Sequence, residues 1–598
     1  MILFKRNNPS EEDSLKLKNI VSVFKDILEK VILKAADEDL TNISQNETIK
    51  LYIKLCLKFG ISGEPTLLKI LANLVNILAK SMDKEDGRLI LEMMLSHSEF
   101  LNYVLGEHSD IKLGILSLFL VLCKNWSEFM ERNHIPVLLA AYRSMVNRCD
   151  RIILSMLKLY EAKAGQTSFY DFKPYLWGKS AASHYSVRLN IETALWRQPK
   201  MGDVLDILQD EFVLLTIKNY PLKEKLQLAD SEVFEIAEEK CYDLKFLLPL
   251  FSQLLAPEQQ VQTYKFTRSG ALSLTVVGLS SSDIEVRQAA CHVLSRFNYH
   301  MDARQSGKDN LLWLRYVEAV CKGTAVLPDF KLNNFAAIYL ARMALILTQP
   351  NHVMYVPLSQ HLSAKSSLDF STVPELYTFL HSSDVNYKDH RNFILDLLKD
   401  GLRTESDFTD LLRSMAFKLF SELYSSSLSD WDTKSLILDV IDSACKIPLG
   451  VKMLCENHSL LTQLFNNVYN VLSATNKEKS EVHVAIFKIF NILLKIIKVL
   501  VDSHSSFIVL NIVLMVVKDD VFKFLSKDCK KVVFEISYLI FGRFGNLLSE
   551  EISSVFINKS NDKFCKYVSE HGCQFVDLNT LDSGDEYYFL RLLLCNKQ

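Results

Sequence analysis

The chain has 598 residues, of which 49% are hydrophobic and 23% charged, and its 18 Gly and 13 Pro are roughly half the usual share of turn-forming residues. So few helix breakers predict a chain made mostly of long helices. The formal net charge of −3 at pH 7 excludes a globally basic nucleic-acid coat and a strongly acidic chaperone-like tail. Any contact with nucleic acid must therefore be local.

Residues 1–12 are predicted to be a flexible N-terminus, and residues 13–163 to form N-terminal helical repeats. The first stretch is polar and lacks the apolar core of a secretory signal, so an intracellular location is expected. The most apolar runs of the chain are 113–123 and 507–517, eleven residues each. A bilayer needs about 18 to 20 apolar residues to be crossed. Both runs are therefore predicted to be buried helices.

The main break in helical periodicity spans residues 164–202, where Gly, Pro and aromatic residues gather. Such a segment is either functional or disordered in an otherwise helical chain, and its aromatic content favours an ordered excursion packed on the helices. Aromatic rings can stack unpaired bases while basic side chains neutralise phosphates. Packing of the rings onto the helices and contact with RNA or a peptide both stay open. The candidate contact residues are Phe169, Tyr170, Lys173, Tyr175, Trp177, Lys179 and Arg188.

Charge is asymmetric around this break. Residues 151–200 carry eight Lys or Arg against three acids, and residues 203–240 carry ten acids against four lysines. The two blocks can pair with each other. They can equally provide a positive patch for RNA phosphates and an acidic patch for a basic partner.

Residues 203–557 are predicted to form the central and C-terminal repeats of the array. The sharpest repeat signal is 282–294, which looks like the second helix of a HEAT repeat entered through a Ser/Asp turn. Asp283 can cap the start of this helix, and three apolar residues at i, i+4 and i+8 form a buried stripe. The arginine after the first of them is placed to reach an acidic turn in an adjoining repeat. The predicted repeat core is Val286, Arg287, Ala290 and Leu294.

Two further amphipathic helices follow in this region. The first presents an apolar stripe at i, i+3, i+4 and i+7, which consists of Trp313, Tyr316, Val317 and Val320. The second, 486–500, has apolar residues on one face and lysines on the other. Residues 558–598 are predicted to be a C-terminal segment with a final helix. No fixed repeat length is evident. The sequence therefore predicts an all-α fold, an irregular HEAT/armadillo-like α-solenoid of antiparallel helix pairs.

No constellation of residues with the spacing of a catalytic or metal site is evident. The twelve cysteines are scattered singly without a CxxC pair, and most are expected to be reduced core thiols. The fourteen histidines are isolated and are expected at the surface or at helix caps. Phosphate-cradling, zinc-protease, serine-hydrolase and dinucleotide motifs are missing from the sequence. We therefore expect no catalytic residue, no cofactor, no metal and no enzyme activity, although an irregular active site can escape a motif search.

A series of strings in order along the chain resembles the C-terminal region of the nucleolar pre-ribosomal-associated protein 1 family. The resemblance covers roughly residues 165–465, and its specificity comes from the number and order of the strings. Family members are several times longer and begin with an extensive helical domain. The strings are 169–172, 177–178, 181–182, 184–185, 242–243, 247–251, 254–258, 286–287, 313–314, 335–344, 355–358, 390–393 and 397–402.

This resemblance implies a non-catalytic scaffold of the nucleolus, in the nucleus, that acts in early large ribosomal subunit (60S) biogenesis. It would support pre-rRNA folding and processing. The implied partners are early pre-60S assembly factors, including an RNA helicase, together with pre-rRNA. Neither a membrane nor a small-molecule substrate is implied. The alternative that the composition fits equally well is a HEAT-type protein-binding adaptor or transport receptor outside ribosome assembly.

Overall fold

The structure is a computed structural model, and it describes residues 46–164, 178, 181, 201–220, 240–259, 261–302, 308–364, 368–426, 429–473, 479–518 and 525–544. The all-α prediction is confirmed. Within these ranges the β-type pairing is limited to an isolated antiparallel bridge between Met145 and Tyr242. The chain divides into two compact units, one ending at Asn310 and the other beginning at Leu311.

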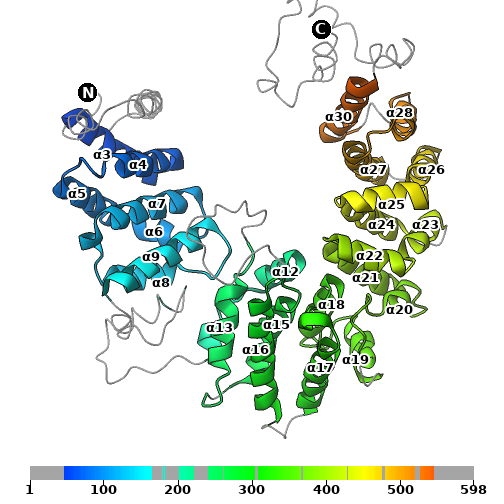
Figure 1. The fold of residues 1–598 in the computed structure, drawn as a ribbon, viewed down its shortest axis with the longest axis horizontal. Helices are drawn as coiled ribbons and strands as arrows, with labels where there is room; N and C mark the ends of the chain where they lie inside the picture. The colour runs from blue at the N-terminus through cyan, green and yellow to red at the C-terminus, as the bar shows by residue number, and fades with distance from the viewer. Residues whose placement is uncertain are drawn as a thin grey trace, which may run out of the picture. The chain divides into compact units, whose positions relative to one another are not determined.

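The first unit begins with helices that stack in two layers (Figure 1). Helix α4 packs on α7, and α7 packs on α9, while α3, α5, α6 and α8 cover them from the other layer. The described helices of this part are α3 (Glu47–Ile61), α4 (Pro65–Leu78), α5 (Lys84–Leu95), α6 (Phe100–Leu105), α7 (Asp110–Asn125), α8 (His134–Ala141) and α9 (Arg148–Ala164).

Local sequence explains where these helices start. The side chain of Asn46 accepts a hydrogen bond from the Thr48 amide at the start of α3, and Ser109 accepts one from the Lys112 amide at the start of α7. Pro65 occupies the first turn of α4, where a missing amide costs nothing. Helix α7 contains the predicted run 113–123 and buries most of it. Across the described part of the chain, no helix is long and apolar enough to cross a bilayer.

The rest of the first unit is built around α16, which packs against α13 and α15. The Asp283 carboxylate accepts a hydrogen bond from the Glu285 amide at 3.0 Å, at the start of α16. The helices of this part are α11 (Met201–Leu205), α12 (Asp210–Asn219), α13 (Leu244–Leu254), α14 (Thr263–Arg268), α15 (Ala271–Gly278) and α16 (Ile284–Asp302).

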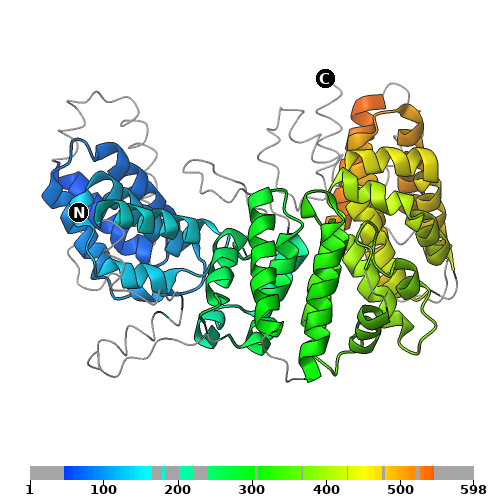
Figure 2. The same ribbon diagram turned by 60° about the horizontal axis from the view of Figure 1, so that its bottom comes forward.

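The second unit is also a two-layered stack of helix pairs (Figure 2). One layer runs in the order α18, α21, α24, α27 and α30, each packed on the next, and helices between them form the other layer. The described helices, the first of which begins just before the boundary at Asn310, are α17 (Lys308–Ala325), α18 (Asn334–Ile346), α19 (Tyr355–Ala364), α20 (Leu376–Leu380), α21 (Tyr387–Gly401), α22 (Glu405–Arg413), α23 (Ala416–Ser425), α24 (Trp431–Ala444), α25 (Pro448–His458), α26 (Leu460–Ser473), α27 (Lys479–Val499), α28 (Ser503–Lys518) and α30 (Lys527–Phe544).

Candidate functional site

The predicted contact residues of the 164–202 excursion fall outside the described residues. These are Phe169, Tyr170, Lys173, Tyr175, Trp177, Lys179 and Arg188. Two small residues of the same segment, Gly178 and Ala181, are described, and both are buried. Gly178 has a φ of +60°, and a Cβ added there would lie 3.2 Å from Ile207 Cδ1 and 3.6 Å from the Tyr142 carbonyl oxygen. Glycine is therefore favoured at this position by both its backbone angle and its surroundings.

Gly178 lies against a junction at which the loop between α8 and α9 meets the segment before α13. The Val146 amide donates to the Cys241 carbonyl, and the Asp243 amide donates to the Ser144 carbonyl, each at 2.8 Å. These bonds flank the bridge between Met145 and Tyr242. Although α9 and α13 are far apart in sequence, backbone pairing holds their starts together.

Tyr242 ties a third segment to this junction. Its hydroxyl donates to the Ile207 carbonyl at 3.1 Å and accepts from the Gln209 amide at 2.9 Å, while its own amide donates to Thr216 Oγ1 at 2.9 Å. The ring is 1% exposed. A buried tyrosine that uses its hydroxyl as both donor and acceptor fixes the position of the α11–α12 connection.

A buried carboxyl shapes the same loop. Asp150 Oδ2 accepts from the Met145 amide at 2.8 Å and from the Arg143 amide at 3.2 Å. Burial raises the pKa of Asp150 to about 6, although these amides and Lys112 oppose the shift. Lys112 is also buried, which lowers its pKa, and its ammonium donates to the Gly106 and Ala141 carbonyls, each at 3.2 Å. The junction is thus a polar, titratable cluster inside the first unit.

The residues of the predicted repeat core lie on α16. Val286, Ala290 and Leu294 are each no more than 2% exposed, and Arg287 is 5% exposed. The Arg287 guanidinium donates to the Ser281 and Ser282 carbonyls at 2.8 and 3.1 Å. These acceptors belong to the turn that precedes its own helix, and the contact of Arg287 with an acidic turn of an adjoining repeat stays a prediction. The charge stabilises the carbonyls of the turn between α15 and α16.

Ion pairs connect the successive helices of one layer in the second unit, and we call them the ion-pair ladder. Asp439 on α24 is central, because it pairs with Lys399 of α21 at 3.2 Å and with Lys488 of α27 at 2.7 Å. Carboxylates around Lys399, foremost Asp439, raise its pKa against the opposing effect of burial. The other pairs of the ladder are Arg342–Asp400, Lys495–Asp442 and Lys498–Glu535.

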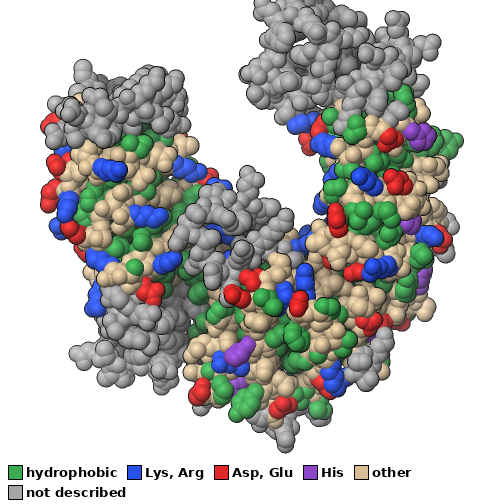
Figure 3. All heavy atoms as spheres, viewed as in Figure 1, with side chains coloured by type: hydrophobic (Ala, Val, Ile, Leu, Met, Phe, Trp, Pro, Cys, Tyr) green, Lys and Arg blue, Asp and Glu red, His purple; other side chains and the backbone are tan. Residues whose placement is uncertain are grey.

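The ladder explains the polar side of the helix predicted at 486–500. Its lysines are predicted to occupy the face opposite the apolar stripe, and Lys488 and Lys495 do so while pairing with acids of α24. Lys488 also donates to Ser435 Oγ at 2.7 Å. The cations of the ladder thus have carboxylate partners already, so this layer is a cross-linked structural face. Figure 3 shows both signs of charge on the visible surface of each unit.

The expectation that histidines lie at the surface or at caps is wrong for several of them, because His134, His300 and His390 are buried. His390 is buried, and its Nδ1 lies 2.8 Å from Ser382 Oγ. The His361 side chain is 8% exposed, and its Nδ1 lies 3.0 Å from Glu375 Oε1. Both are paired within the packing between helices, which a one-dimensional pattern does not reveal. In the part of the chain that the structure describes, no group of three or more His, Cys, Asp or Glu side chains is placed to hold a metal ion.

Comparison with known proteins tests the family resemblance that the sequence strings indicate. The model of a family described as nucleolar pre-ribosomal-associated protein 1 matches residues 272–463, from α15 to α26. The human protein of that name is 30% identical over 434 residues, which cover 69% of this chain and 19% of the human one. The resemblance to this family is confirmed. The mouse nucleolar pre-ribosomal-associated protein 1 is 28% identical over 455 residues, covering 70% of this chain and 20% of the mouse one.

The chain therefore spans about a fifth of the length of these curated nucleolar pre-ribosomal-associated proteins. Their name describes an association with pre-ribosomes in the nucleolus and no catalytic activity. The match to the family model runs through the predicted repeat core and includes Asp439 of the ion-pair ladder. The matched region is thus helical-repeat structure in both units of this chain.

Proposed function

We propose that this chain is a non-catalytic scaffold of the nucleolus that acts in early large-subunit (60S) ribosome biogenesis and supports pre-rRNA folding and processing. The observation that carries the proposal is the similarity to human nucleolar pre-ribosomal-associated protein 1 over 69% of the chain. A stack of helix pairs such as each unit contains suits a scaffold, because each pair presents its own surface to a partner. The proposed partners are early pre-60S assembly factors, including an RNA helicase, and pre-rRNA.

RNA contact is proposed to be local and to involve the basic residues of the 164–202 excursion. Two observations support this assignment. The cations of the ion-pair ladder are already neutralised by carboxylates, and the excursion is tied to the first unit through buried Gly178 and Ala181. Phosphate contacts depend on cations that release counterions from the nucleic acid. In the excursion, the proposed cations are Lys173, Lys179 and Arg188.

The proposal is tested by ultraviolet crosslinking of the tagged chain in cells, followed by sequencing of the attached RNA, with gradient fractionation in parallel. We expect crosslinks concentrated in large-subunit pre-rRNA and co-sedimentation with ribosomal precursors. Co-sedimentation without crosslinks would keep the scaffold function and remove the RNA contact. Background RNA together with soluble protein partners would reject the proposal in favour of an adaptor or transport receptor outside ribosome assembly.

A further inference from the structure

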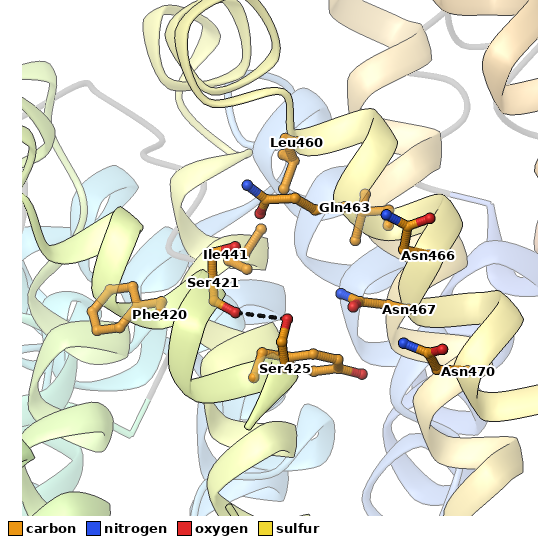
Figure 4. A pocket seen from close by; sticks show the side chains of 11 residues that line it. Phe420, Ser421, Ser425, Ile441, Leu460, Gln463, Asn466, Asn467 and Asn470 are labelled. Carbon is orange, nitrogen blue, oxygen red and sulfur yellow. Dashed lines mark hydrogen bonds between the residues drawn. The ribbon is translucent and has the colours of Figure 1, made fainter. Parts of the chain in front are cut away.

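The second unit contains a cleft between α23 and α26 whose lining is uncharged, with polar walls and an apolar floor. Its volume is about 360 Å³, within the range of pockets that hold small ligands or short segments. Four carboxamides on α26 form one wall, and two serines on α23 form the other (Figure 4). Phe420, Tyr424, Ile441, Leu460 and Leu464 complete the lining. We call this cleft the carboxamide groove, after Gln463, Asn466, Asn467 and Asn470.

The carboxamides are arranged as a row along α26. Gln463, Asn467 and Asn470 stand at i, i+4 and i+7, so they share one helix face, and Figure 4 shows them directed toward Ser421 and Ser425. With a rise of about 1.5 Å per residue, the row spans about 10.5 Å. An extended polypeptide advances about 3.4 Å per residue, so about three of its residues match this length.

Within the described part of the chain, the carboxamides of Asn466 and Asn467 have no hydrogen-bond partner, and Asn466 is exposed while Asn467 is half-buried. Gln463 donates its Nε2 hydrogen to the His458 carbonyl at 2.8 Å, which leaves its Oε1 as an acceptor. On the opposite wall, Ser425 Oγ donates to the Ser421 carbonyl at 3.0 Å and keeps its own lone pairs for an incoming donor. The groove thus offers donors and acceptors side by side.

We propose that the carboxamide groove binds the main chain of an extended, uncharged segment of a partner protein. A carboxamide carries one acceptor and two donor hydrogens, so it can pair with both the carbonyl and the amide of a peptide unit. The spacing of about 6 Å between Gln463 and Asn467 along the helix axis is close to the two-residue repeat of about 6.7 Å at which an extended chain presents the same edge.

The floor of the groove determines which side chains of the bound segment fit. Phe420 and Leu464 are fully buried and Tyr424 and Ile441 are 8% exposed, which makes the floor apolar. Successive side chains of an extended segment point to opposite sides. Every second residue therefore faces the floor, where small aliphatic side chains such as Ala and Val fit, and the residues between them face water.

The same chemistry disfavours nucleic acid in the groove. Nucleic-acid affinity depends on cations that neutralise phosphates, and none of the lining residues is charged. Base stacking needs an open aromatic face, whereas Phe420 is 0% and Tyr424 8% exposed. Lys434, whose Nζ lies 5.9 Å from the centroid of the Tyr424 ring, is not part of the lining. This inference is independent of the role in ribosome assembly.

The test uses the purified full chain and a pool of fluorescein-labelled, N-acetylated, C-amidated hexapeptides built from Ala, Val, Ser and Thr. We expect a saturable rise in fluorescence anisotropy. Asn466→Ala combined with Asn467→Ala should weaken binding at least tenfold, without lowering the melting temperature, because Ala is the better helix former. Asn511→Ala, an exposed position of α28, is the matched control and should change nothing.

A second pool in which alternate amides are N-methylated separates main-chain recognition from adhesion of side chains. It should bind at least tenfold more weakly than the unmethylated pool. Equal binding of the two pools, or no saturable binding by the wild-type chain, would overturn the proposal. So would fluorescein-labelled oligouridine that binds more tightly than the peptides and is released by the double variant, because the groove would then hold nucleic acid.

Discussion

Leu294 illustrates how single residues of α16 support the first unit. It is 2% exposed and lies on the same stripe as Val286 and Ala290. Leu294→Ala removes buried methyl groups and leaves a cavity, so we expect a loss of about 2 to 5 kcal/mol in the free energy of unfolding. Urea unfolding followed by circular dichroism measures it.

Ile284→Ala is the matched control, because Ile284 begins the same helix and is 49% exposed. Its effect should stay within about 0.5 kcal/mol. Equal effects of the two substitutions would show that Leu294 is not part of the core and would undermine the repeat assignment at α16.

Also at the residue scale, the buried Asp150 makes the free energy of unfolding depend on pH. Its folded pKa of about 6 exceeds the ordinary value of 3.8 because the carboxyl is buried. The folded state therefore holds a proton that the unfolded state has released, and this group's contribution to stability falls as pH rises from about 4 to about 6. Asp150→Asn should flatten this fall. The free energy of unfolding of the variant, relative to that of the wild type, should therefore rise by up to about 3 kcal/mol between pH 4 and pH 7.

Unfolding in urea at both pH values measures the difference between variant and wild type. The charges of Lys112 and Arg143 also act on Asp150 and contribute to its pKa. The variant and the wild type are therefore compared by the slope of the free energy of unfolding against pH. Asp110→Asn is the control, because that side chain is 70% exposed. A difference between Asp150→Asn and the wild type that does not vary with pH would contradict the raised pKa.

At the scale of elements, the ion-pair ladder couples neighbouring helix pairs. Asp439 pairs with lysines of both α21 and α27, and its side chain is 20% exposed. Asp439→Asn keeps the volume but removes the charge, leaving Lys399 and Lys488 with weaker partners. We expect a loss of about 1 to 3 kcal/mol, since hydrogen bonds to charged groups contribute in this range. Urea unfolding at low and at 1 M salt checks it, and the loss should shrink at high salt.

The control for this substitution is Glu92→Gln. Glu92 pairs with Arg88 one turn away in α5, and both side chains are 60% exposed. Exposed pairs of this kind contribute about 0.3 to 0.5 kcal/mol. If the two substitutions cost the same, the ladder would have no special role in coupling α21, α24 and α27.

At the scale of the whole molecule, the proposed RNA contact depends on the excursion between α9 and α11. Replacing Lys173, Lys179 and Arg188 by Glu should lower RNA retention and flatten its salt dependence, because fewer counterions are released on binding. The melting temperature should not fall. Filter binding of pre-rRNA fragments over a range of salt concentrations measures this.

Replacing Lys54, Lys80 and Lys124 by Glu provides a control with the same change in charge at exposed positions of the first unit. RNA retention that falls equally in both triple variants would point to a general charge effect. Unchanged retention in the first variant would return the excursion to a packing role.

Local sequence is sufficient to predict which stretches are helical and which of their faces are buried. Helical period, caps and apolar stripes involve residues close together in the chain, so the places of Asp283, Val286 and Leu294 on their helix follow from the sequence pattern alone. The family resemblance is likewise readable, because its strings keep their order. The boundary between the two units cannot be read from the sequence, because no Pro, Gly or Ser-rich linker marks the passage from Asn310 to Leu311.

Which side chains meet depends instead on how the helices pack. Asp439 reaches both Lys399 and Lys488 because three helices stack in one layer. The carboxamides of α26 form a groove only because α23 lies opposite them. The repeats are irregular, so no fixed period relates one helix pair to the next, and the register between helices is set by packing. Local sequence therefore specifies the helices, while the sites between them arise from the way the helices are stacked.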